Sequence, residues 1–438
     1  MKELKRPYRV IKKTIGAQKL CVDLVYKLSS FVVVKETEKH LYLYHTLTTQ
    51  CRQLDLRSLP KRLLGSEIEK DPELKILTED WFYVKESLNE SQNYYSIYKM
   101  LRLLRGGKGY PIYYILPTSG CNARCPYCYE EGMRKVTMTE ETALATASFI
   151  VATLRKNTKL QLFWYGGEPL LGEKAIDLIS DRLRNEEIDF SSCMITNGSL
   201  INDKIIWKMK HEWATELVQI SMDCAEEEYI KRRNYYHYHD EYHSVMEAVN
   251  GLAQNGIQPV IRCNVDLDNI DKGEEFLGDL KQAIREPSKV KVYFAPLFQE
   301  RKMHGEILWK KAFELADIAH KMGFSYRFDD FPACVPFFFC PNDGTTESVT
   351  IDPLGRLFGC SDCIEGTSFG DVRNGITDSE KWKERNRIGK IKEKCENCAY
   401  LPICTPFEDC PFKNPQCDVL PAYQVECGFK KVIEENEF

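Results

Sequence analysis

Cysteine constrains the fold of this chain more than any other residue type. The sequence has 438 residues and 18 cysteines, of which 13 fall into two groups, at positions 121–128 and 334–427. No apolar signal segment follows the first residues, MKELKRPYRVIKK, so we expect the grouped cysteines to bind metal or iron–sulfur clusters rather than form disulfides. The five scattered cysteines are predicted to be small buried apolar side chains: Cys21, Cys51, Cys193, Cys224 and Cys263.

Charge and hydropathy argue against two other classes of protein. The chain carries 60 basic and 65 acidic residues, a formal net charge of −5 at pH 7, which implies no strong positive field for a nucleic-acid partner. It has no apolar run of about 18 residues or more, the length that a membrane-spanning helix needs. We therefore predict a cytoplasmic protein with neither a nucleic-acid nor a membrane partner.

Between residue 111 and about residue 325, apolar strand-like runs alternate with segments of helical periodicity. Six such pairs in series predict a parallel β-sheet, either open or curved into a partial barrel, with Thr139 as a suitable cap for the first helix. In such folds the chemistry lies at the carboxyl ends of the strands. The expected strands are 111–117, 160–166, 192–198, 217–223, 259–267 and 290–298, and the expected helices are 139–156, 173–186, 203–214, 243–255, 273–285 and 307–322.

The two flanking zones differ from this α/β region. Residues 1–105 contain β-like runs at 31–36 and 40–47 and end in a helical stretch. From residue 326 onward, cysteine, proline and glycine become frequent and periodicity fades, so we expect an irregular domain that metal clusters help to order. The sequence therefore predicts three domains, at 1–105, 106–325 and 326–438.

The first cysteine group directly follows the first predicted strand, in the sequence TSGCNARCPYCYEEG (118–132). Its C-x3-C-x2-C spacing requires Cys121, Cys125 and Cys128 to converge on one small object. A zinc ion needs a fourth ligand, and this loop offers no histidine or further cysteine, although a distant ligand remains open. A 4Fe-4S cluster with three protein ligands keeps one iron free for a substrate, which suits chemistry rather than passive electron transfer.

This stretch resembles the signature of the radical S-adenosylmethionine (SAM) superfamily, C-x3-C-x-aromatic-C, with Tyr127 at the aromatic position near the cofactor. The resemblance implies a TIM-like partial (β/α)6 barrel. It also implies a 4Fe-4S cluster whose open iron binds S-adenosyl-L-methionine, and cleavage of that cofactor to a 5′-deoxyadenosyl radical that takes a hydrogen atom from the substrate. In WYGGEP (164–169), Gly166, Gly167 and Glu168 resemble the family motif that binds the methionine amino group.

Four further residues resemble family positions near the cofactor, at the ends of the third, fourth and fifth predicted strands. Asn197 and Ser221 lie in ITNG and ISMD, and Arg262 and Asn264 lie in IRCNVD, which resembles a ribose-binding region. The alternative, that all four are strand-end polar groups satisfied within the protein, stays open. The family often has glycine after the aspartate of ISMD, whereas this chain has Cys224, so the shape of that loop is not predicted.

The second cysteine group resembles a SPASM domain, an extension of certain radical SAM enzymes that binds two auxiliary 4Fe-4S clusters, which makes three clusters in all. The ligands that this resemblance implies are Cys334, Cys340, Cys360 and Cys410 for the first auxiliary cluster and Cys395, Cys398, Cys404 and Cys427 for the second. Five residues instead of the usual three separate Cys404 from Cys410, so Cys417 is an alternative to Cys410, and Cys363 has no assigned role. A pair of zinc sites is the other interpretation of this group.

Two polar segments receive a structural rather than a functional interpretation. YYHYHDEYH (235–243) places His237, His239 and His243 at spacings that a metal site can use, but we favour a polar aromatic loop before a helix. The basic run KRR (231–233) is predicted to be a solvated turn, with contact to an acidic peptide as the alternative.

The cysteine groups indicate how a radical is made and leave its target open. Enzymes with SPASM domains commonly modify peptides, and residues 1–105 resemble, in element order, the winged-helix-like module with which peptide maturases bind a leader peptide as an extra strand. The resemblance implies a ribosomal-peptide (RiPP) maturase that crosslinks a precursor peptide, with a cysteine thioether as the leading product. A one-electron reductant such as flavodoxin or ferredoxin is the expected second partner.

Two alternatives to this maturase remain open at the level of the sequence. One is an anaerobic sulfatase-maturating type of enzyme, which oxidises Cys or Ser to formylglycine. The other is not an enzyme but an iron–sulfur electron carrier or peptide-binding module, which would not need the GGEP motif. No residue is identified as a catalytic base, because many Asp, Glu and Tyr side chains can serve.

Overall fold

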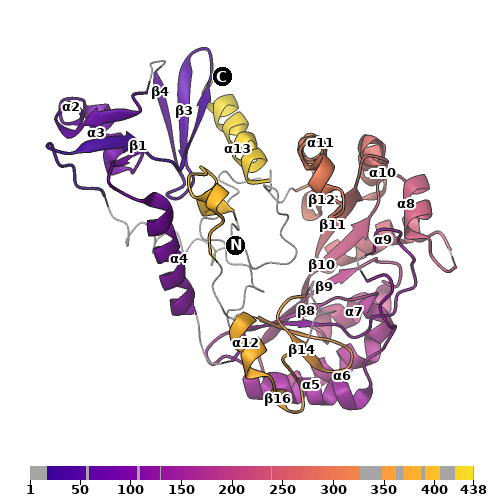
Figure 1. Ribbon diagram of the computed structural model, residues 1–438. Helices are drawn as coiled ribbons and strands as arrows, with labels where there is room; N and C mark the ends of the chain where they lie inside the picture. The colour runs from indigo at the N-terminus through magenta and orange to yellow at the C-terminus, as the bar shows by residue number, and fades with distance from the viewer. Residues whose placement is uncertain are drawn as a thin grey trace.

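A large mixed sheet forms the centre of the molecule in the computed structural model, which describes residues 17–55, 59–105, 109–128, 130–237, 239–325, 348–361, 368–385, 390–404 and 420–437. Within that part of the chain the sheet has ten strands in the order β12-β11-β10-β9-β8-β7-β13-β14-β15-β16 (Figure 1). Strands β7 to β12 are parallel to their neighbours and follow one another in sequence. Their bounds are Ile112–Ile115, Leu160–Trp164, Phe190–Thr196, Thr215–Met222, Gln258–Val265 and Lys291–Pro296. All six predicted strands are therefore confirmed.

Helices connect these strands and cover one face of the sheet. In β10 the buried side chains Val218, Ile220 and Met222 alternate with the half-exposed Gln219 and Ser221, so one face enters the main apolar core and the other faces the concave side. The Thr139 hydroxyl accepts a hydrogen bond from the Thr142 amide (3.1 Å), as predicted for a cap. The six predicted helices are confirmed as α5 Glu140–Thr153, α6 Glu173–Asn185, α7 Asp203–His211, α9 Glu241–Gln254, α10 Gly273–Ala283 and α11 Arg301–Lys321.

The sheet continues beyond β7 into the C-terminal zone. Strand β13 pairs with β7 in parallel, and three short antiparallel strands follow at its outer edge. Their bounds are β13 Ser348–Ile351, β14 Arg356–Phe358, β15 Gly370–Asp371 and β16 Gly375–Ile376, followed by helix α12 Ser379–Arg385. The expectation of an irregular region from residue 326 onward is thus wrong for these residues, because strands of two to four residues are too short to show periodicity and are fixed by pairing with β7.

The N-terminal module, residues 17–105, contains two small sheets and the helices that follow them. One sheet has the order β2-β3-β4 and is an antiparallel meander, and the other has the order β5-β1-β6. The strands are β1 Val25–Leu28, β2 Val32–Glu36, β3 His40–His45, β4 Gln50–Asp55, β5 Arg62–Leu64 and β6 Tyr83–Lys85, and the helices are α2 Gly65–Ile68, α3 Pro72–Glu79 and α4 Glu90–Arg105. Both predicted β-runs and the predicted helix ending at residue 105 are confirmed.

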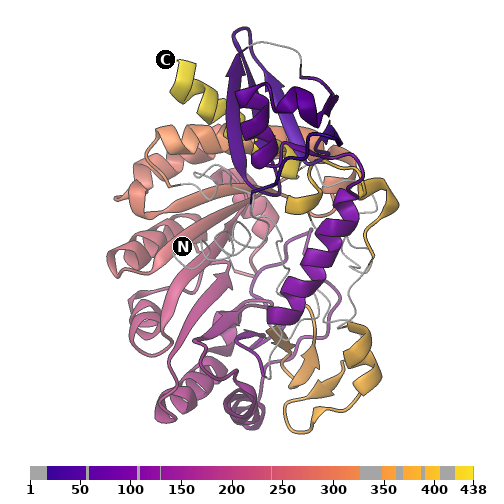
Figure 2. The same ribbon diagram turned by 90° about the vertical axis from the view of Figure 1, so that its left-hand side faces the viewer.

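The β2-β3-β4 sheet packs against the opposite end of the chain. One of its faces contributes Leu41, Leu43 and Leu54 to the core of the N-terminal module. The other face packs Tyr42 and Tyr44 against the C-terminal helix α13 (Leu420–Glu437) and the segment at 401–403. Figures 1 and 2 show this arrangement, with α4 running from the module along the side of the central sheet. Two chain ends that are about 350 residues apart in sequence therefore form one packed unit, joined also by the Thr46 hydroxyl donating to the Ala399 carbonyl (2.6 Å, a separation of 353 residues).

Candidate active site at the carboxyl ends of the central strands

The loop after β7 carries the first cysteine group, and its two ends are tied together. The Ser119 hydroxyl donates to the Arg134 carbonyl (2.9 Å) and accepts from the Val136 amide (2.8 Å). The Ser119 amide in turn donates to the Val136 carbonyl (2.9 Å), and the Thr118 and Thr137 hydroxyls bond at 2.9 Å. The loop is therefore closed at its base, directly at the carboxyl end of β7.

The three cysteine thiols of this loop lie close enough to interact electrostatically. Burial, together with the neighbouring Glu168, Cys125 and Cys128, raises the pKa of Cys121 to about 11. Three thiols on one loop are the soft sulfur donors that an iron–sulfur cluster takes.

A buried ion-pair network lies against this loop. Helix α8 (Glu226–Arg233) ends in Arg233, whose guanidinium donates to the Cys125 sulfur (3.7 Å) and pairs with the Asp223 carboxylate (2.6 Å). The Tyr127 hydroxyl donates to the same carboxylate (2.5 Å). Burial raises the pKa of Tyr127 well above its usual range, and the Asp223 charge adds to this effect, so the phenol stays protonated. The aromatic residue of the cysteine motif thus anchors the loop to the end of β10.

The same network contradicts the predicted solvated turn at 231–233. Arg232 and Arg233 are only 7% and 5% exposed. Arg232 donates to the Asp266 carboxylate (2.7 Å), and its guanidinium lies 5.1 Å from the centre of the Tyr127 ring. The partners, Asp223 and Asp266, directly follow β10 and β11, so the local sequence of the basic run shows no sign of them.

The GGEP segment follows β8 and lies directly on the base of the cysteine loop. The Gly167 amide donates to the Thr118 carbonyl (3.2 Å) and the Glu168 amide donates to the Gly120 carbonyl (2.8 Å). A Cβ atom on Gly167 would lie 2.1 Å from the Gly120 carbonyl oxygen, and Gly166 has a φ of +119°. Only glycine permits both the close backbone approach and this backbone conformation.

Glu168 is fully buried and connects the ends of two strands. Its carboxylate accepts from the Thr196 hydroxyl (2.8 and 2.9 Å to the two oxygens), the Asn197 amide (2.9 Å) and the Leu170 amide (3.1 Å). Burial raises the pKa of this carboxyl, and the amide donors oppose the shift. Most of its acceptor capacity is therefore used inside the protein, in the position where the family motif implies contact with the cofactor.

Asn197 joins this carboxylate to the first cysteine. Its side-chain amide donates to the Asn122 side-chain carbonyl (2.8 Å) and lies 4.0 Å from the Cys121 sulfur. The Asn197 side-chain oxygen accepts from the Ser199 amide (3.0 Å), which fixes the side chain. The structure thus brings together three of the predicted site residues: Cys121, Glu168 and Asn197.

Three other predicted residues lie on the concave side of the neighbouring strands. Ser221 of β10 is the register partner of Arg262 of β11, which in turn pairs with Tyr293 of β12. The Arg262 Nε atom is buried and has no hydrogen-bond partner in the described part of the chain. Asn264 is buried two residues further along β11, and its carbonyl accepts from the Asn269 side chain (2.9 Å). An unsatisfied buried donor at a strand end is suited to an anionic or polar ligand.

Cys224, at the position where the family often has glycine, adopts a backbone conformation that glycine favours. Its φ is +67°, in the left-handed region. Its amide donates to the Cys263 sulfur (3.1 Å), and the two sulfurs lie 3.3 Å apart. Both residues are fully buried, as predicted. The same prediction is wrong for the other scattered cysteines, which are only partly buried: Cys21, Cys51 and Cys193.

Some of the predicted auxiliary ligands lie outside the described residues. These are Cys334, Cys340 and Cys410, and the same holds for the unassigned Cys363 and for Cys417, the alternative to Cys410. Cys395 and Cys398 lie beside Leu401 and α4. Cys360 follows β14 near the barrel mouth, where the Tyr165 hydroxyl donates to the Ser361 carbonyl (3.2 Å).

Cys427 lies on the face of α13 that points toward α11. On that face Tyr423 stacks on Phe313 and Lys430 pairs with Asp317 (3.0 Å), whereas Val425 packs on the other face with Ile403. Burial, together with the Asp317 charge, raises the pKa of Cys427 to about 11. Cys427 therefore does not share the helix face that packs against the 401–403 segment.

Of the histidine segment, His237 and His239 precede α9 and His243 lies in its first turn, whereas Tyr235 and Tyr242 are buried, so the predicted polar loop is only partly confirmed. His243 lies 2.7 Å from the Asp240 carboxylate and 3.8 Å from Glu226, an exposed group of three that has a spacing open to a metal ion. The Asp240 charge raises the pKa of His243. His237 and His239 do not belong to this group, and exposed acidic groups of this kind are common without a metal.

Thiols on a loop after the first of six parallel strands, with a glycine-rich segment after the second, define an iron–sulfur site in an α/β enzyme fold. Residues 115–267 match the family model described as the Radical SAM superfamily. The chain therefore carries a radical SAM domain and is an enzyme of radical chemistry. Among the described residues, no helix is long and apolar enough to cross a membrane.

Two curated proteins illustrate the similarity in sequence. The GTP 3′,8-cyclase of Clostridium perfringens strain SM101 is 25% identical over 317 residues, which cover 65% of this chain and 94% of the cyclase. The radical SAM cyclopropyl synthase TigE of Paramaledivibacter caminithermalis is 27% identical over 146 residues, which cover 29% of this chain and 30% of the synthase.

Two solved structures share the fold. The structure of anSMEcpe with bound AdoMet and Cp18Cys peptide has a TM-score of 0.52 at 17% identity, with 74% of this chain and 98% of that chain covered. Streptococcus suis SuiB has a TM-score of 0.50 at 13% identity, with 88% and 94% covered. Identities this low establish the shared fold and leave the substrate of this chain to be argued from its own residues.

Proposed function

We propose that this protein is a radical SAM maturase that crosslinks a ribosomally synthesised precursor peptide, with a cysteine thioether as the bond formed. The observation that carries the proposal is the β2-β3-β4 sheet, which is covered on both faces by apolar packing. A sheet covered in this way presents only its edges, and an edge strand is a template for an extended peptide. The peptide bound by the structural neighbour anSMEcpe supports the same class of substrate.

The residues of the site fit the cofactors that this reaction needs. Cys121, Cys125 and Cys128 would hold the 4Fe-4S cluster, since they offer three thiols on one loop, and N–H groups of Ala123 (3.5 Å) and Arg233 (3.7 Å) donate to the sulfurs of Cys121 and Cys125. When bound and reduced, the cluster and SAM supply a 5′-deoxyadenosyl radical that takes a hydrogen atom from the peptide. The residues proposed to hold SAM are Tyr127, Gly166, Gly167, Glu168, Asn197, Ser221, Arg262 and Asn264.

These residues act mainly by fixing the loop and the strand ends. Glu168 holds the Thr196 hydroxyl and the Asn197 amide, so the ends of β8 and β9 stay in register below the cysteine loop. The Tyr127 hydroxyl is committed to Asp223, its ring lies 5.1 Å from the Arg232 guanidinium and its carbonyl accepts from the Gln299 side chain (3.0 Å), so Tyr127 acts by positioning the cysteine loop. The proposed auxiliary ligands are unchanged from the resemblance: Cys334, Cys340, Cys360 and Cys410, and Cys395, Cys398, Cys404 and Cys427.

A nucleotide cyclisation is the second candidate, because the alignment with GTP 3′,8-cyclase spans 94% of that enzyme. The N-terminal module argues for the peptide, since a cyclase of a free nucleotide has no use for a sheet that can accept an added strand. Oxidation of a peptide Cys or Ser to formylglycine is a third outcome within the peptide class.

The test begins with anaerobic reconstitution of the full chain and addition of SAM and dithionite. Formation of 5′-deoxyadenosine is expected, and its absence defeats the radical proposal. Small open reading frames next to the gene then supply candidate precursor peptides for mass spectrometry. A crosslink removes two hydrogens and keeps the sulfur, formylglycine formation from Cys removes the sulfur, and consumption of GTP in place of any peptide would establish the cyclase candidate.

A further inference from the structure

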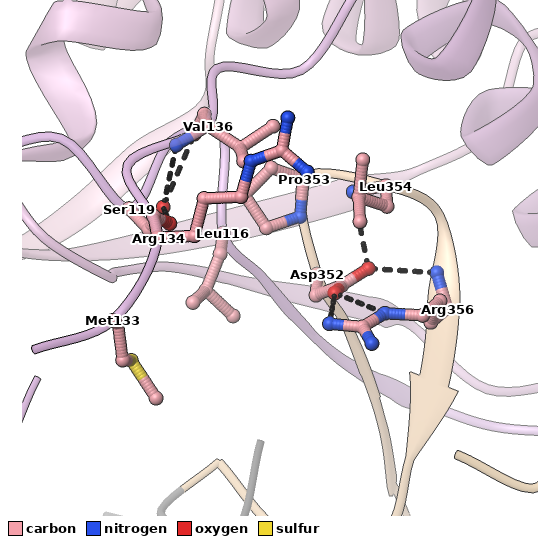
Figure 3. Close-up of a pocket in the computed structure, with 9 residues that line it drawn as sticks. All are labelled: Leu116, Ser119, Met133, Arg134, Val136, Asp352, Pro353, Leu354 and Arg356. Atoms are coloured by element: carbon pink, nitrogen blue, oxygen red, sulfur yellow. Dashed lines mark hydrogen bonds and ion pairs between the residues drawn. The ribbon is translucent and has the colours of Figure 1, made fainter. Parts of the chain in front are cut away.

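A cavity of about 460 Å³ lies between the base of the cysteine loop and the turn that joins β13 to β14 (Figure 3). Ser119, Met133 and Arg134 line it from the loop, and Pro353 and Leu354 line it from the turn. Leu116, at the end of β7, forms part of its floor. A space of this size suits a small ligand or one to three residues of a peptide. None of the residues assigned above to SAM lines this cavity.

Both walls of the cavity are held in place by hydrogen bonds. On the loop side, Ser119 bonds to the backbone of Arg134 and Val136 (2.9 and 2.8 Å). On the turn side, the buried Asp352 carboxylate accepts from the Leu354 amide (3.1 Å) and the Arg356 amide (2.8 Å). A ligand that enters therefore meets a largely preformed site, and binding does not have to order the walls.

Among the residues that the structure describes, the charges around the cavity leave one cation, Arg134, without a partner. Arg356 is neutralised by Asp352, which accepts from its Nε (2.7 Å) and pairs with its Nη2 (2.6 Å). Arg134 is exposed, and among the described residues its guanidinium makes no ion pair or hydrogen bond. Figure 3 shows the Arg134 side chain extending from the loop side toward Pro353. The rest of the lining is largely apolar, from Leu116, Met133 and Leu354.

We propose that this cavity binds a segment of the substrate peptide in which an acidic residue stands next to an apolar one. The inference rests on the proposed maturase function and specifies its substrate. The apolar side chain occupies the space between Met133 and Leu354, and the carboxylate pairs with Arg134. A single free cation matches one carboxylate, whereas a nucleoside triphosphate brings several negative charges that this site does not balance.

The position of the cavity gives this binding a role in the reaction. One wall is the base of the loop that carries Cys121, Cys125 and Cys128, and the other leads through β14 to Cys360. A peptide anchored here therefore lies between the proposed radical cluster and the C-terminal cysteines. The anchor selects peptides and sets their register, while the chemistry takes place at a neighbouring residue of the peptide.

The experiment titrates two peptides, acetyl-Gly-Leu-Asp-Gly-amide and acetyl-Gly-Leu-Asn-Gly-amide, into the reconstituted full chain by calorimetry. An exposed ion pair is worth up to about 1 kcal/mol, so the Asp peptide is expected to bind up to about fivefold more tightly. Arg134→Gln should remove this preference and Arg134→Lys should keep part of it. Lys135→Gln is the matched control, because it removes the same charge one residue away from the cavity lining and should leave the preference intact.

The other outcomes overturn the inference. Equal affinity of the two peptides, a preference that survives Arg134→Gln, or no binding at millimolar concentration each contradicts it. GTP is the third probe, and GTP binding that weakens in Arg134→Gln would assign the cavity to a nucleotide. The proposed function is tested by a separate measurement, the formation of 5′-deoxyadenosine, and this assay needs neither peptide. If SAM is cleaved but the Asp peptide is not preferred, only the inference about the substrate is contradicted.

Discussion

The two cysteine regions of this protein are held by different kinds of interaction. The first loop is fixed by polar contacts: Ser119 closes its base, and Asp223 and Arg233 hold Tyr127 and Cys125. The segment at 390–404 is held instead by tight turns, such as the Cys398 amide donating to the Cys395 carbonyl (3.2 Å), and by apolar packing of Leu401 and Ile403 on the N-terminal module.

This difference shows which interactions stabilise the first cysteine loop and which stabilise the 390–404 segment. The first loop belongs to the barrel, and its shape depends on buried charges that are costly to leave unpaired. The second segment depends on a docked module, so anything that loosens the module also loosens the cysteines. The comparison predicts that changes near β10 affect the radical site, and that changes in β3 affect the C-terminal segment.

The largest effect is expected from Cys125→Ala, which removes a proposed cluster ligand from the first loop. Iron content should fall by about four atoms per chain, and 5′-deoxyadenosine formation should fall to background. Cys193→Ala is the matched control, because Cys193 is a partly buried cysteine of β9 outside both groups, and it should keep both properties. Full iron content and turnover in Cys125→Ala would show that the loop does not hold the cluster.

A smaller but still large effect is expected from Arg233→Gln. Asp223 has no exposed surface, and loss of its closest cation leaves the buried carboxylate with the Tyr127 hydroxyl and the more distant Arg232, whose Nε lies 3.5 Å away. Breaking a buried pair in this way costs about 3–5 kcal/mol of unfolding free energy, measured by urea denaturation. Because Arg233 also donates to Cys125, the reduction midpoint of the first cluster, followed by electron paramagnetic resonance, should shift as well.

The double variant Asp223→Asn/Arg233→Gln separates the two roles of the arginine. Removing both charges should recover much of the stability, while the altered midpoint should persist because the donor to Cys125 is still missing. A double variant as unstable as Arg233→Gln alone would indicate that the ion pair is not the source of the loss.

The sequence predicts the parallel strands of the central sheet well and the buried ion pairs at their ends poorly, for physical reasons. Runs such as 217–223 are apolar because parallel strands are buried, and the cysteine loop and GGEP segment occupy fixed places after two of them. Arg232 and Arg233 were misplaced because their partners, Asp223 and Asp266, lie on other strand ends. From the sequence alone, a run of three basic residues is expected to be exposed, because the acidic residues that pair with it are distant in sequence.

The C-terminal zone shows the opposite limit. Strands β14 to β16 contain two or three residues each, which is too short for hydrophobic periodicity to predict them. The contact between α13 and β3 joins positions more than 350 residues apart, and no local signal carries it. Cys224 is the exception: the family position favours glycine, and the left-handed backbone that explains this preference is retained here with a cysteine.

The smallest effect concerns pH and the N-terminal module. His45 is fully buried in β3, where its Nδ1 accepts from the Leu47 and Thr48 amides (3.2 and 3.3 Å), and burial lowers its pKa from 6.5 to about 4. The unfolded chain therefore binds this proton more readily than the folded one. The stability that neutral His45 provides is complete above pH 6.5 and is lost as the pH falls toward 4, by about 3 kcal/mol in all.

This loss should appear in the module before it appears in the barrel. Hydrogen exchange, corrected for the intrinsic pH dependence, is expected to show that β3 loses protection between pH 6.5 and 4, together with the 401–403 segment that packs on the module. Strand β10 should keep its protection over the same range. His45→Asn retains an acceptor but cannot titrate there, so it should abolish the pH dependence, whereas His243→Asn, at an exposed histidine, should preserve it. An equal loss of hydrogen-exchange protection in β3 and β10 would mean that the N-terminal module and the central sheet unfold as one unit. The two cysteine regions would then differ in local geometry and would not have separate sources of stability.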